Sequence, residues 1–278
     1  MTTMRTVVIS GAARGIGRAT ALLLDWQGWH VFAGVRQPAA AVALQQAASP
    51  RLVPLLFDLT DPASLERAAA TVAQHVGGQG LHGLVNNANI IMPGPLEYLP
   101  LAAMHQQLAV GLVGQLALTQ QMLPLLRQPP GRIINISSGS GRLVRPLLAA
   151  YSSTKFGLEA LSDGLRMELA PWGVRVIVIQ PGAIATPAWE ATIRHLDTTI
   201  AALPATGRQH YGTALQRLQA ALQATLPHRT PADRVAALIA HALETPRPRT
   251  RYTVGYGGWR DVVLARLPDW LRDDLLRW

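Results

Sequence analysis

The sequence predicts an α/β protein built on a doubly wound parallel sheet, with helices covering both faces. Short, β-branched apolar segments alternate with segments whose apolar residues recur at helical spacing over most of the 278 residues. The strand-like segments are almost continuously apolar, as expected for parallel strands that are buried on both faces. No linker of biased composition and no internal repeat divides the chain. We therefore expect a single domain over residues 1–278.

Seven segments are predicted to form the strands of this sheet. They cover residues 6–10, 30–35, 51–58, 83–88, 132–137, 174–181 and 251–255. Pro54 lies inside the third segment, where proline is unfavourable because it has no N–H to donate to the sheet.

Helices are predicted between the strands. Their residues are 14–29, 38–48, 61–76, 100–127, 151–172 and 231–244. The clearest start has Asp61 as N-cap and Pro62 in the first turn. Residues 183–230 interrupt the alternation, and we interpret them as a substrate lid. Residues 256–278 form a C-terminal extension with an amphipathic end, which would pack on its own domain or a partner subunit, or touch a membrane surface.

Composition excludes several classes of function. There is no cysteine and no HExxH or CxxC pattern, so we expect neither thiolate chemistry nor a metal. The formal charge is +9, but the arginines are spread along the chain rather than clustered, which argues against nucleic acid as a partner. Neither a signal peptide nor an apolar stretch of about 18 residues is recognised, which predicts a cytoplasmic protein without a membrane-spanning segment.

A glycine-rich turn follows the first predicted strand. In SGAARGIG, residues 10–17, the glycines are Gly11, Gly15 and Gly17. Glycine allows a tight turn, close approach of a pyrophosphate and close packing of helix on strand, and the helix N-terminus offers free N–H groups to phosphates. A turn that merely needs positive φ is the alternative. The position between strand and helix favours a dinucleotide site that includes Arg14 and Ile16.

The end of the second strand bears on the choice of cofactor. An acid there would bind the ribose 2′-hydroxyl of NAD, but the sequence has Arg36 and no acid between Asp25 and Asp58. Arg36 and Arg14 could hold a 2′-phosphate, so we expect NADP(H) in preference to NAD(H), which stays possible. The alternative is that both arginines are solvated. Asp58 would accept from the adenine amino group or cap a turn.

Tyr151 and Lys155 are four residues apart on a predicted helix and therefore share a face. Lys155 is the one lysine beside 24 arginines. A nearby ammonium favours phenolate, so we expect it to lower the pKa of Tyr151 and let the hydroxyl exchange a proton near neutral pH. Ser138, at the end of the fifth strand, could donate to a substrate carbonyl. The alternative, chance occurrence of YxxxK, is weakened by this serine.

Taken together, these motifs resemble the short-chain dehydrogenase/reductase family over residues 5 to about 190. The resemblance implies a Rossmann-type sheet of about seven strands, hydride transfer between a nicotinamide cofactor and an alcohol or carbonyl, and a homodimer or homotetramer formed through the helices at 100–127 and 151–172. It implies that Tyr151 is the acid/base, Ser138 orients the substrate and Lys155 holds the nicotinamide ribose. The further cofactor contacts that it implies are Asn87, Ala88, Asn89, Pro181, Gly182, Ile184 and Thr186.

Two residues depart from the family pattern. Asn89 replaces the glycine of NNAG, and Gly111 stands where a catalytic asparagine is usual. In the family that asparagine supports a water in the proton relay to the lysine. A second water could fill the space at Gly111, or the protein could bind cofactor without turnover.

The segments expected near the nicotinamide are apolar and predict a bulky apolar alcohol or carbonyl substrate. They are residues 90–99 and 143–148, with Ile184, Trp189, Ile193 and Leu196 of the lid. Within the family, the chain looks most like retinol and steroid dehydrogenases. Alternatively these side chains pack the lid on the core. Two other functions stay open: a non-catalytic NADP(H)-binding sensor or scaffold, and a sugar-nucleotide epimerase or dehydratase, whose glycine pattern differs.

Overall fold

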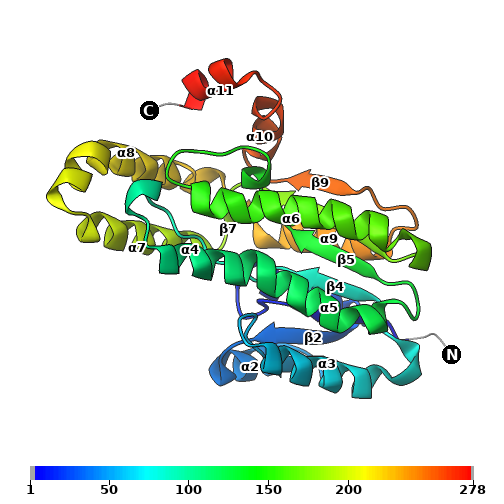
Figure 1. Ribbon diagram of the computed structural model, residues 1–278. Helices are drawn as coiled ribbons and strands as arrows, with labels where there is room; N and C mark the ends of the chain where they lie inside the picture. Colours follow the sequence, from blue (N-terminus) through cyan, green and yellow to red (C-terminus); the bar gives the residue numbers. More distant parts are fainter. Residues whose placement is uncertain (1–3, 277–278) are drawn as a thin grey trace.

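A seven-stranded parallel sheet forms the centre of the computed structural model, which describes residues 4–276 (Figure 1). The strand order is β3-β2-β1-β4-β5-β6-β9. The strands are β1 Thr6–Ile9, β2 His30–Val35, β3 Leu52–Leu56, β4 Gly83–Asn86, β5 Arg132–Ile136, β6 Arg175–Pro181 and β9 Arg251–Val254. The predicted fold class is confirmed, and each predicted strand contains one of these.

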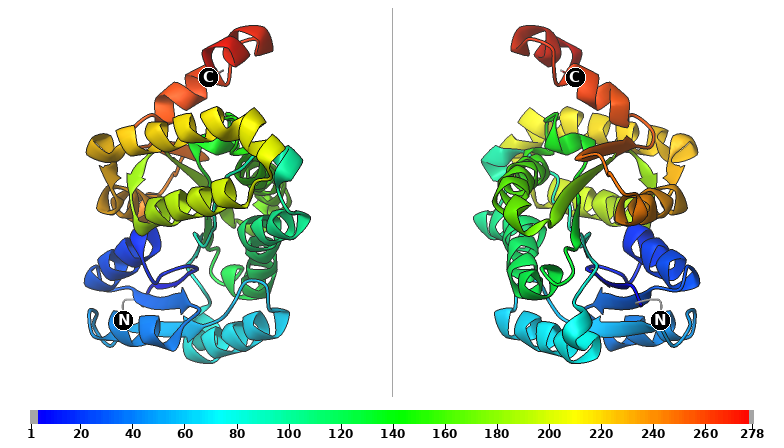
Figure 2. Two further views of the ribbon diagram at one scale, coloured as in Figure 1. Left: turned by 90° about the vertical axis from the view of Figure 1, so that its left-hand side faces the viewer. Right: turned by 90° about the vertical axis from the view of Figure 1, so that its right-hand side faces the viewer.

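Helices cover both faces of the sheet (Figure 2). One layer contains α1 Gly15–Trp26, α2 Pro38–Gln45 and α9 Ala232–Glu244. The other contains α3 Pro62–Val76, α4 Leu101–Leu108, α5 Gly114–Leu126 and α6 Ala149–Glu168. Alternate residues of a strand feed the two layers, as the pleat requires: Val7 and Ile9 join one apolar cluster, and Val8 joins the other.

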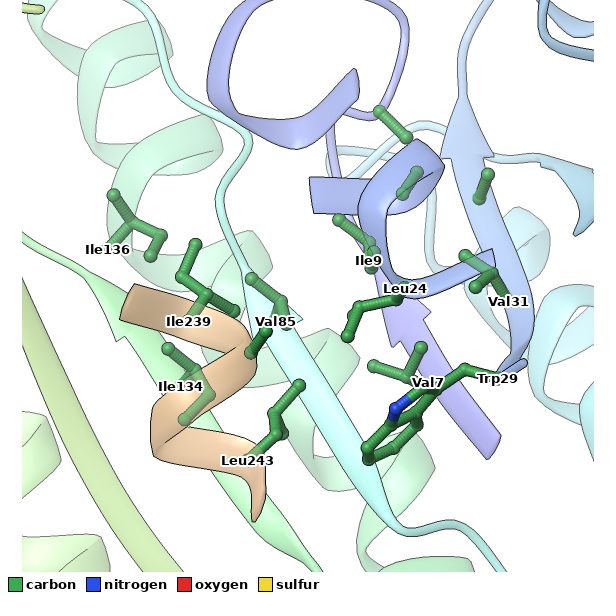
Figure 3. Close-up of a cluster of buried hydrophobic side chains, with 14 of the residues drawn as sticks. Val7, Ile9, Leu24, Trp29, Val31, Val85, Ile134, Ile136, Ile239 and Leu243 are labelled. Carbon is green, nitrogen blue, oxygen red and sulfur yellow. The ribbon is translucent and has the colours of Figure 1, made fainter. Parts of the chain in front are cut away.

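Figure 3 shows the core between the sheet and the layer of α1 and α9. Leu24 of α1 and the nearby Trp29 cover Val7, while Leu243 of α9 lies beside Val85. These side chains have at most a few per cent of their surface exposed, and burying each contributes roughly 1.5–3 kcal/mol. This core fixes the strand ends from which the functional loops leave the sheet.

Pro54 is accommodated because β3 is an edge strand. Its register places Pro54 beside Ala33 of β2, and among residues 4–276 β3 pairs with no other strand. Edge strands tolerate a missing N–H better than central strands do.

The long helix predicted at residues 100–127 is interrupted. α4 ends at Leu108, a π-helical turn spans Ala109–Val113, and α5 begins at Gly114. Gly111 is buried inside this turn. An insertion of this kind bulges the helix and occurs frequently at functional sites.

The combined segment Leu101–Leu126 is the one helix within residues 4–276 that is long and apolar enough, by length and composition, to cross a membrane. This finding leaves the expectation that no apolar stretch reaches about 18 residues unconfirmed. In the structure Leu118, Met122 and Leu126 are fully buried against the sheet. A core helix passes the same test of length and composition, so the absence of a membrane span stays a prediction.

The segment interpreted as a lid leaves and rejoins the domain at one point, because β7 Ile184–Ala185 pairs with β8 Thr230–Pro231. Between them lie α7 Pro187–Ala202 and α8 Ala205–Ala224. The two helices share a small core of their own, formed by Leu196, Leu203, Leu215, Leu218 and Leu222 together with Leu147.

The C-terminal extension forms two short helices at the top of Figure 1, α10 Gly258–Leu264 and α11 Asp269–Leu276. α10 docks on the domain through the buried side chain of Asp261, which pairs with Arg145. α11 buries no residue, and Trp270 is 70% exposed. Residues 277–278 of the predicted extension lie outside the described residues.

Candidate functional site

The glycine turn brings three segments of the chain into close contact. Gly11 has φ +68°, and a Cβ there would lie 2.8 Å from Ala88 Cα. A Cβ on Gly17 would lie 2.3 Å from the carbonyl oxygen of Gly11 and 2.6 Å from Asn87 Nδ2. Such distances exclude any side chain at Gly11 and Gly17. The turn therefore has the close helix–strand packing expected where a backbone cradles phosphates.

Hydrogen bonds join this turn to the loop after β4. The hydroxyl of Ser10 accepts from the backbone N–H groups of Asn87 and Ala88 at 2.9 and 3.0 Å. Asn87 Nδ2 donates to the carbonyl oxygens of Ser10 and Gly11 at 2.9 and 3.1 Å. Asn87 thus holds the turn with its side chain, a role that the sequence reasoning did not assign to it.

The N-terminus of α1 is open to an anion. Its N-cap residue, Arg14, has extended backbone and makes no side-chain capping bond, and the first turn holds no acid. The first N–H groups of the helix, including that of Ile16, are therefore free of a side-chain cap. The residues present fit a pyrophosphate at this position.

Arg36 and Asp58 lie together at the ends of β2 and β3, where a guanidinium nitrogen and a carboxylate oxygen are 3.9 Å apart. The other carboxylate oxygen accepts from the backbone N–H and hydroxyl of Thr60 at 2.8 and 2.7 Å, so Asp58 does cap a turn. Burial raises the pKa of Asp58, but the Thr60 hydrogen bonds and the charge of Arg36 outweigh it and the pKa is lowered. The Arg36 side chain is 65% exposed and can swing toward a phosphate.

Residues after β6 close the other side of the turn. A Cβ on Gly15, which has φ +56°, would contact the Thr186 side chain at 3.2 Å. Gly182, next to Pro181 at the end of β6, lies against the backbone of Tyr256. The Ile184 side chain is in the core and would contact a Cβ on Gly255 at 2.7 Å, so its cofactor contact stays a prediction for the backbone.

Ser138 and Tyr151 come together at the end of β5. Ser138 is the N-cap of a 3₁₀ turn at Gly139–Gly141, and its hydroxyl accepts from the Ser140 N–H at 3.1 Å. The Ser138 side chain also hydrogen bonds to the Tyr151 hydroxyl. One hydroxyl pair therefore faces the position where a carbonyl or alcohol oxygen would bind.

The expected lowering of the Tyr151 pKa is not what the structure shows. Burial raises the pKa of Tyr151, and the hydrogen bond from Ser138 offsets this only in part. The Lys155 ammonium lies 5.8 Å from the centre of the tyrosine ring, and the raised pKa shows that its charge does not outweigh the effect of burial. Tyr151 is therefore protonated at neutral pH and suited to donate a proton.

Lys155 is buried, and its Nζ donates to the carbonyl oxygen of Ile136 at 2.8 Å. Burial lowers the pKa of Lys155 to about 7, although the nearby carboxylate of Glu159 acts to raise it. The group therefore titrates near neutral pH, where it can carry or release a proton.

Sequence reasoning missed the ion network behind Lys155. The buried Glu159 carboxylate accepts from Gln180 Nε2 at 2.8 Å and Arg251 Nε at 2.9 Å, and it lies 3.4 Å from Arg142. Glu159 is four residues after Lys155 on α6, so the helical spacing that linked Tyr151 to Lys155 also pointed to it. Its cationic partners come from β9 and the loop after β5, which no local pattern reveals.

The apolar residues expected to line a substrate pocket divide into two groups. Leu147 and Leu196 are buried in the core of the lid, and Ile184 is buried in the domain core, so the packing alternative holds for these three. A second group is only partly buried, with Trp189 also packed against the lid core: Ile90, Ile91, Met92, Trp189 and Ile193. Arg229 lies 4.8 Å over the Trp189 ring.

Asn89 does not turn its side chain to the glycine turn. Its Oδ1 lies 2.6 Å from the position of a Cβ on Gly111, beside the π-helical turn. The same position is 2.4 Å from Thr154 Cγ2. These contacts supply the reason for glycine in the middle of a helix, since any side chain at 111 would overlap both groups.

An uncapped helix N-terminus after a glycine turn, with serine, tyrosine and lysine at the same edge of a parallel sheet, is the arrangement of a nicotinamide-dependent oxidoreductase. The chain belongs to the short-chain dehydrogenase family: the family model described as short chain dehydrogenase matches residues 5–197. It is an oxidoreductase of that family.

Three similar proteins support this assignment. Retinol dehydrogenase 5 of Homo sapiens is 38% identical, covering 98% of this chain and 87% of its own. 17-beta-hydroxysteroid dehydrogenase type 6 of Bos taurus is 36% identical, and the match covers 97% of this chain and 87% of the bovine protein. A short chain dehydrogenase from Burkholderia cenocepacia J2315, solved in complex with NADP, has a TM-score of 0.75 and 25% identity, covering 99% of each chain.

Proposed function

We propose that this protein is an NADP(H)-dependent oxidoreductase that acts on a bulky apolar alcohol or carbonyl compound. The observation that carries the proposal is the meeting of Ser138, Tyr151 and Lys155 at the sheet edge that also carries the glycine turn. The bound cofactor would supply or accept the hydride.

The chain's own residues would handle the oxygen and its proton. Ser138 donates a hydrogen bond that holds the substrate oxygen and stabilises the negative charge that develops there. Tyr151, whose pKa is raised by burial, gives its proton to that oxygen in the direction of reduction and takes it back in oxidation. Lys155, with a pKa of about 7, then returns a proton toward the tyrosine.

Preference for NADP(H) is supported by charge. Arg14 and Arg36 are both exposed beside the glycine turn, and Asp58, the nearby acid, already contacts Arg36. A guanidinium can bind a phosphate by two parallel hydrogen bonds. NADP in the Burkholderia cenocepacia structure agrees with this preference.

The apolar substrate class is supported by the partly exposed group of Ile91, Met92, Trp189 and Ile193 near the lid. The names of the human and bovine relatives, a retinol dehydrogenase and a hydroxysteroid dehydrogenase, point to substrates of similar size and polarity.

A panel of apolar ketones and aldehydes with NADPH tests the proposal, with Tyr151→Phe as the comparison. We expect wild type to oxidise NADPH with at least one carbonyl and the variant to be slower by about 100-fold or more, in line with the loss of a general acid. If wild type binds NADPH but is no faster than Tyr151→Phe on any carbonyl, the protein is the non-catalytic cofactor-binding protein instead.

Titration of NADPH and NADH against Arg36→Ala tests the cofactor preference. We expect the variant to bind NADPH about 10- to 100-fold more weakly, since a charge-assisted bond contributes roughly 1.5–3 kcal/mol, and its affinity for NADH to be unchanged. Arg67→Ala is the matched control, because Arg67 is 71% exposed and pairs with Asp61 at 3.7 Å away from the glycine turn. Equal affinities of wild type for the two cofactors would remove the phosphate argument.

A further inference from the structure

The carboxamide of Asn89 occupies the space that a side chain at position 111 would fill. A Cβ on Gly111 would lie 2.6 Å from Asn89 Oδ1 and 2.4 Å from Thr154 Cγ2, closer than real Cβ contacts. Residue 111 can therefore carry no side chain while Asn89 adopts this position. The two departures from the family pattern are therefore linked in space. The carboxamide of Asn89, from the loop after β4, fits there because residue 111 is glycine.

The oxygen of this carboxamide lacks a donor. Asn89 Oδ1 is buried and accepts no hydrogen bond from any residue within 4–276. An unpaired buried acceptor costs roughly 1–3 kcal/mol. The neighbouring amide of Gln107 makes other bonds instead: its Nε2 donates to Ile90 O at 2.9 Å and its Oε1 accepts from Met92 N at 3.0 Å.

A charged donor belongs to the same part of the fold. Lys155 follows Thr154 on α6, and its Nζ donates to Ile136 O at the end of β5. β4 and β5 are neighbours, with Asn86 opposite Asn135, so the loop that carries Asn89 leaves the sheet at the same edge as Ile136. An ammonium has three N–H donors, and Ile136 takes one of them.

We propose that Asn89 is a positioning residue for Lys155, with its carboxamide oxygen and the Lys155 ammonium hydrogen bonded to one shared water. The water satisfies the buried oxygen, fixes the direction of the ammonium and links it to the interior of the π-helical turn. The inference deepens the proposed function, on which its predicted effect on turnover rests.

The chain offers a direct measurement that does not need turnover. Lys155 is the one lysine in the sequence, so protein labelled with ¹³C at lysine Cε gives a single lysine side-chain signal whose titration reports this group. We expect Asn89→Ala to lower the Lys155 pKa by about half a unit or more, because the ammonium loses an acceptor. The charged and titratable groups around Lys155 are the same in every variant. They are Tyr151 and Glu159 of α6, with Arg142 and Arg251, which pair with Glu159.

A swap of the two residues distinguishes the amide from mere space filling. The variants are made on Thr154→Ser, which removes the Cγ2 contact and keeps a hydroxyl for the bond to Ala150 O at 3.2 Å. We expect Asn89→Gly to lower the Lys155 pKa and to reduce kcat about tenfold with KM little changed. Adding Gly111→Asn restores both quantities, and adding Gly111→Ala instead restores neither.

The outcomes separate this inference from the proposed function. A Lys155 pKa that is the same in wild type, Asn89→Ala and the folded Asn89→Gly variant overturns the inference, whether or not the enzyme turns over. A lowered pKa in a protein without turnover on any carbonyl supports the positioning role and rejects the proposed function. Full rescue by Gly111→Ala would show that the site needs bulk and not an amide, which also overturns the inference.

Discussion

At the scale of single residues, Lys155 connects the chemistry of the site to the stability of the protein. Burial lowers its pKa from 10.5 to about 7 in the folded chain. Between these two values the unfolded chain binds the extra proton, so this group makes stability rise with pH across that window. Below about pH 7 the buried charge exerts its full destabilising effect, on the order of a few kcal/mol.

Lys155→Met tests this sign. The variant removes the buried charge, so its melting temperature relative to wild type should be higher at about pH 6 than at about pH 9.5. The difference between the two pH values should be several degrees, since about 1 kcal/mol moves Tm by about 2–4 °C in proteins of this size. The lost hydrogen bond to Ile136 shifts both values equally. A difference in melting temperature between variant and wild type that does not change with pH would contradict the lowered pKa of Lys155.

The candidate site residues were predictable because their types and spacing are local in the sequence. The pKa of Tyr151 was not, because it depends on burial by several elements and on the distance to Lys155. The side-chain direction of Asn89 was also hidden, since the space above Gly111 exists only once α6 lies against the π-helical turn.

At the scale of elements, α10 supports the loop that carries Ser138. The Asp261 side chain is 8% exposed and pairs with Arg145 of that loop. A Cβ on Gly139 would lie 2.3 Å from Asp261 Oδ2, so the helix packs directly on the backbone next to Ser138. The C-terminal extension is thus part of the support of the candidate site.

Asp261→Ala is expected to lower both stability and kcat, because the partly buried Arg145 loses its partner and the Ser138 loop loses its contact. We expect a loss of about 1–3 kcal/mol, measured by thermal unfolding, with kcat/KM for an apolar carbonyl reduced severalfold. Asp269→Ala is the control, since Asp269 is 85% exposed beside Arg272 and such pairs contribute little. Equal effects of the two substitutions would argue against a specific role of α10.

At the scale of the whole molecule, the layer of α4, α5 and α6 leaves large apolar side chains in solvent. Val113 is 61% and Met167 is 63% exposed. These helices are the ones through which the sequence analysis expects a homodimer or homotetramer, and apolar residues of this size are consistent with a covered face.

The oligomer prediction is tested by light scattering. We expect wild type to have the mass of at least two chains and the variant Val113→Glu with Met167→Glu to have a lower mass, because two buried charges oppose association. Trp26→Glu is the control: Trp26 is 81% exposed on α1, in the opposite helix layer. A monomeric wild type at micromolar concentration would contradict the prediction.

The sequence by itself determined the parallel α/β architecture, the glycine turn and the tyrosine–lysine pair, because these depend on hydrophobic period and on spacing within one turn or helix. Only the tertiary structure decided how the groups interact. It placed the Glu159 network behind Lys155, packed Leu196 into the lid rather than a pocket, and gave the space at Gly111 to Asn89. Each of these results joins residues from elements far apart in the chain, and burial and packing between such elements have no local signature.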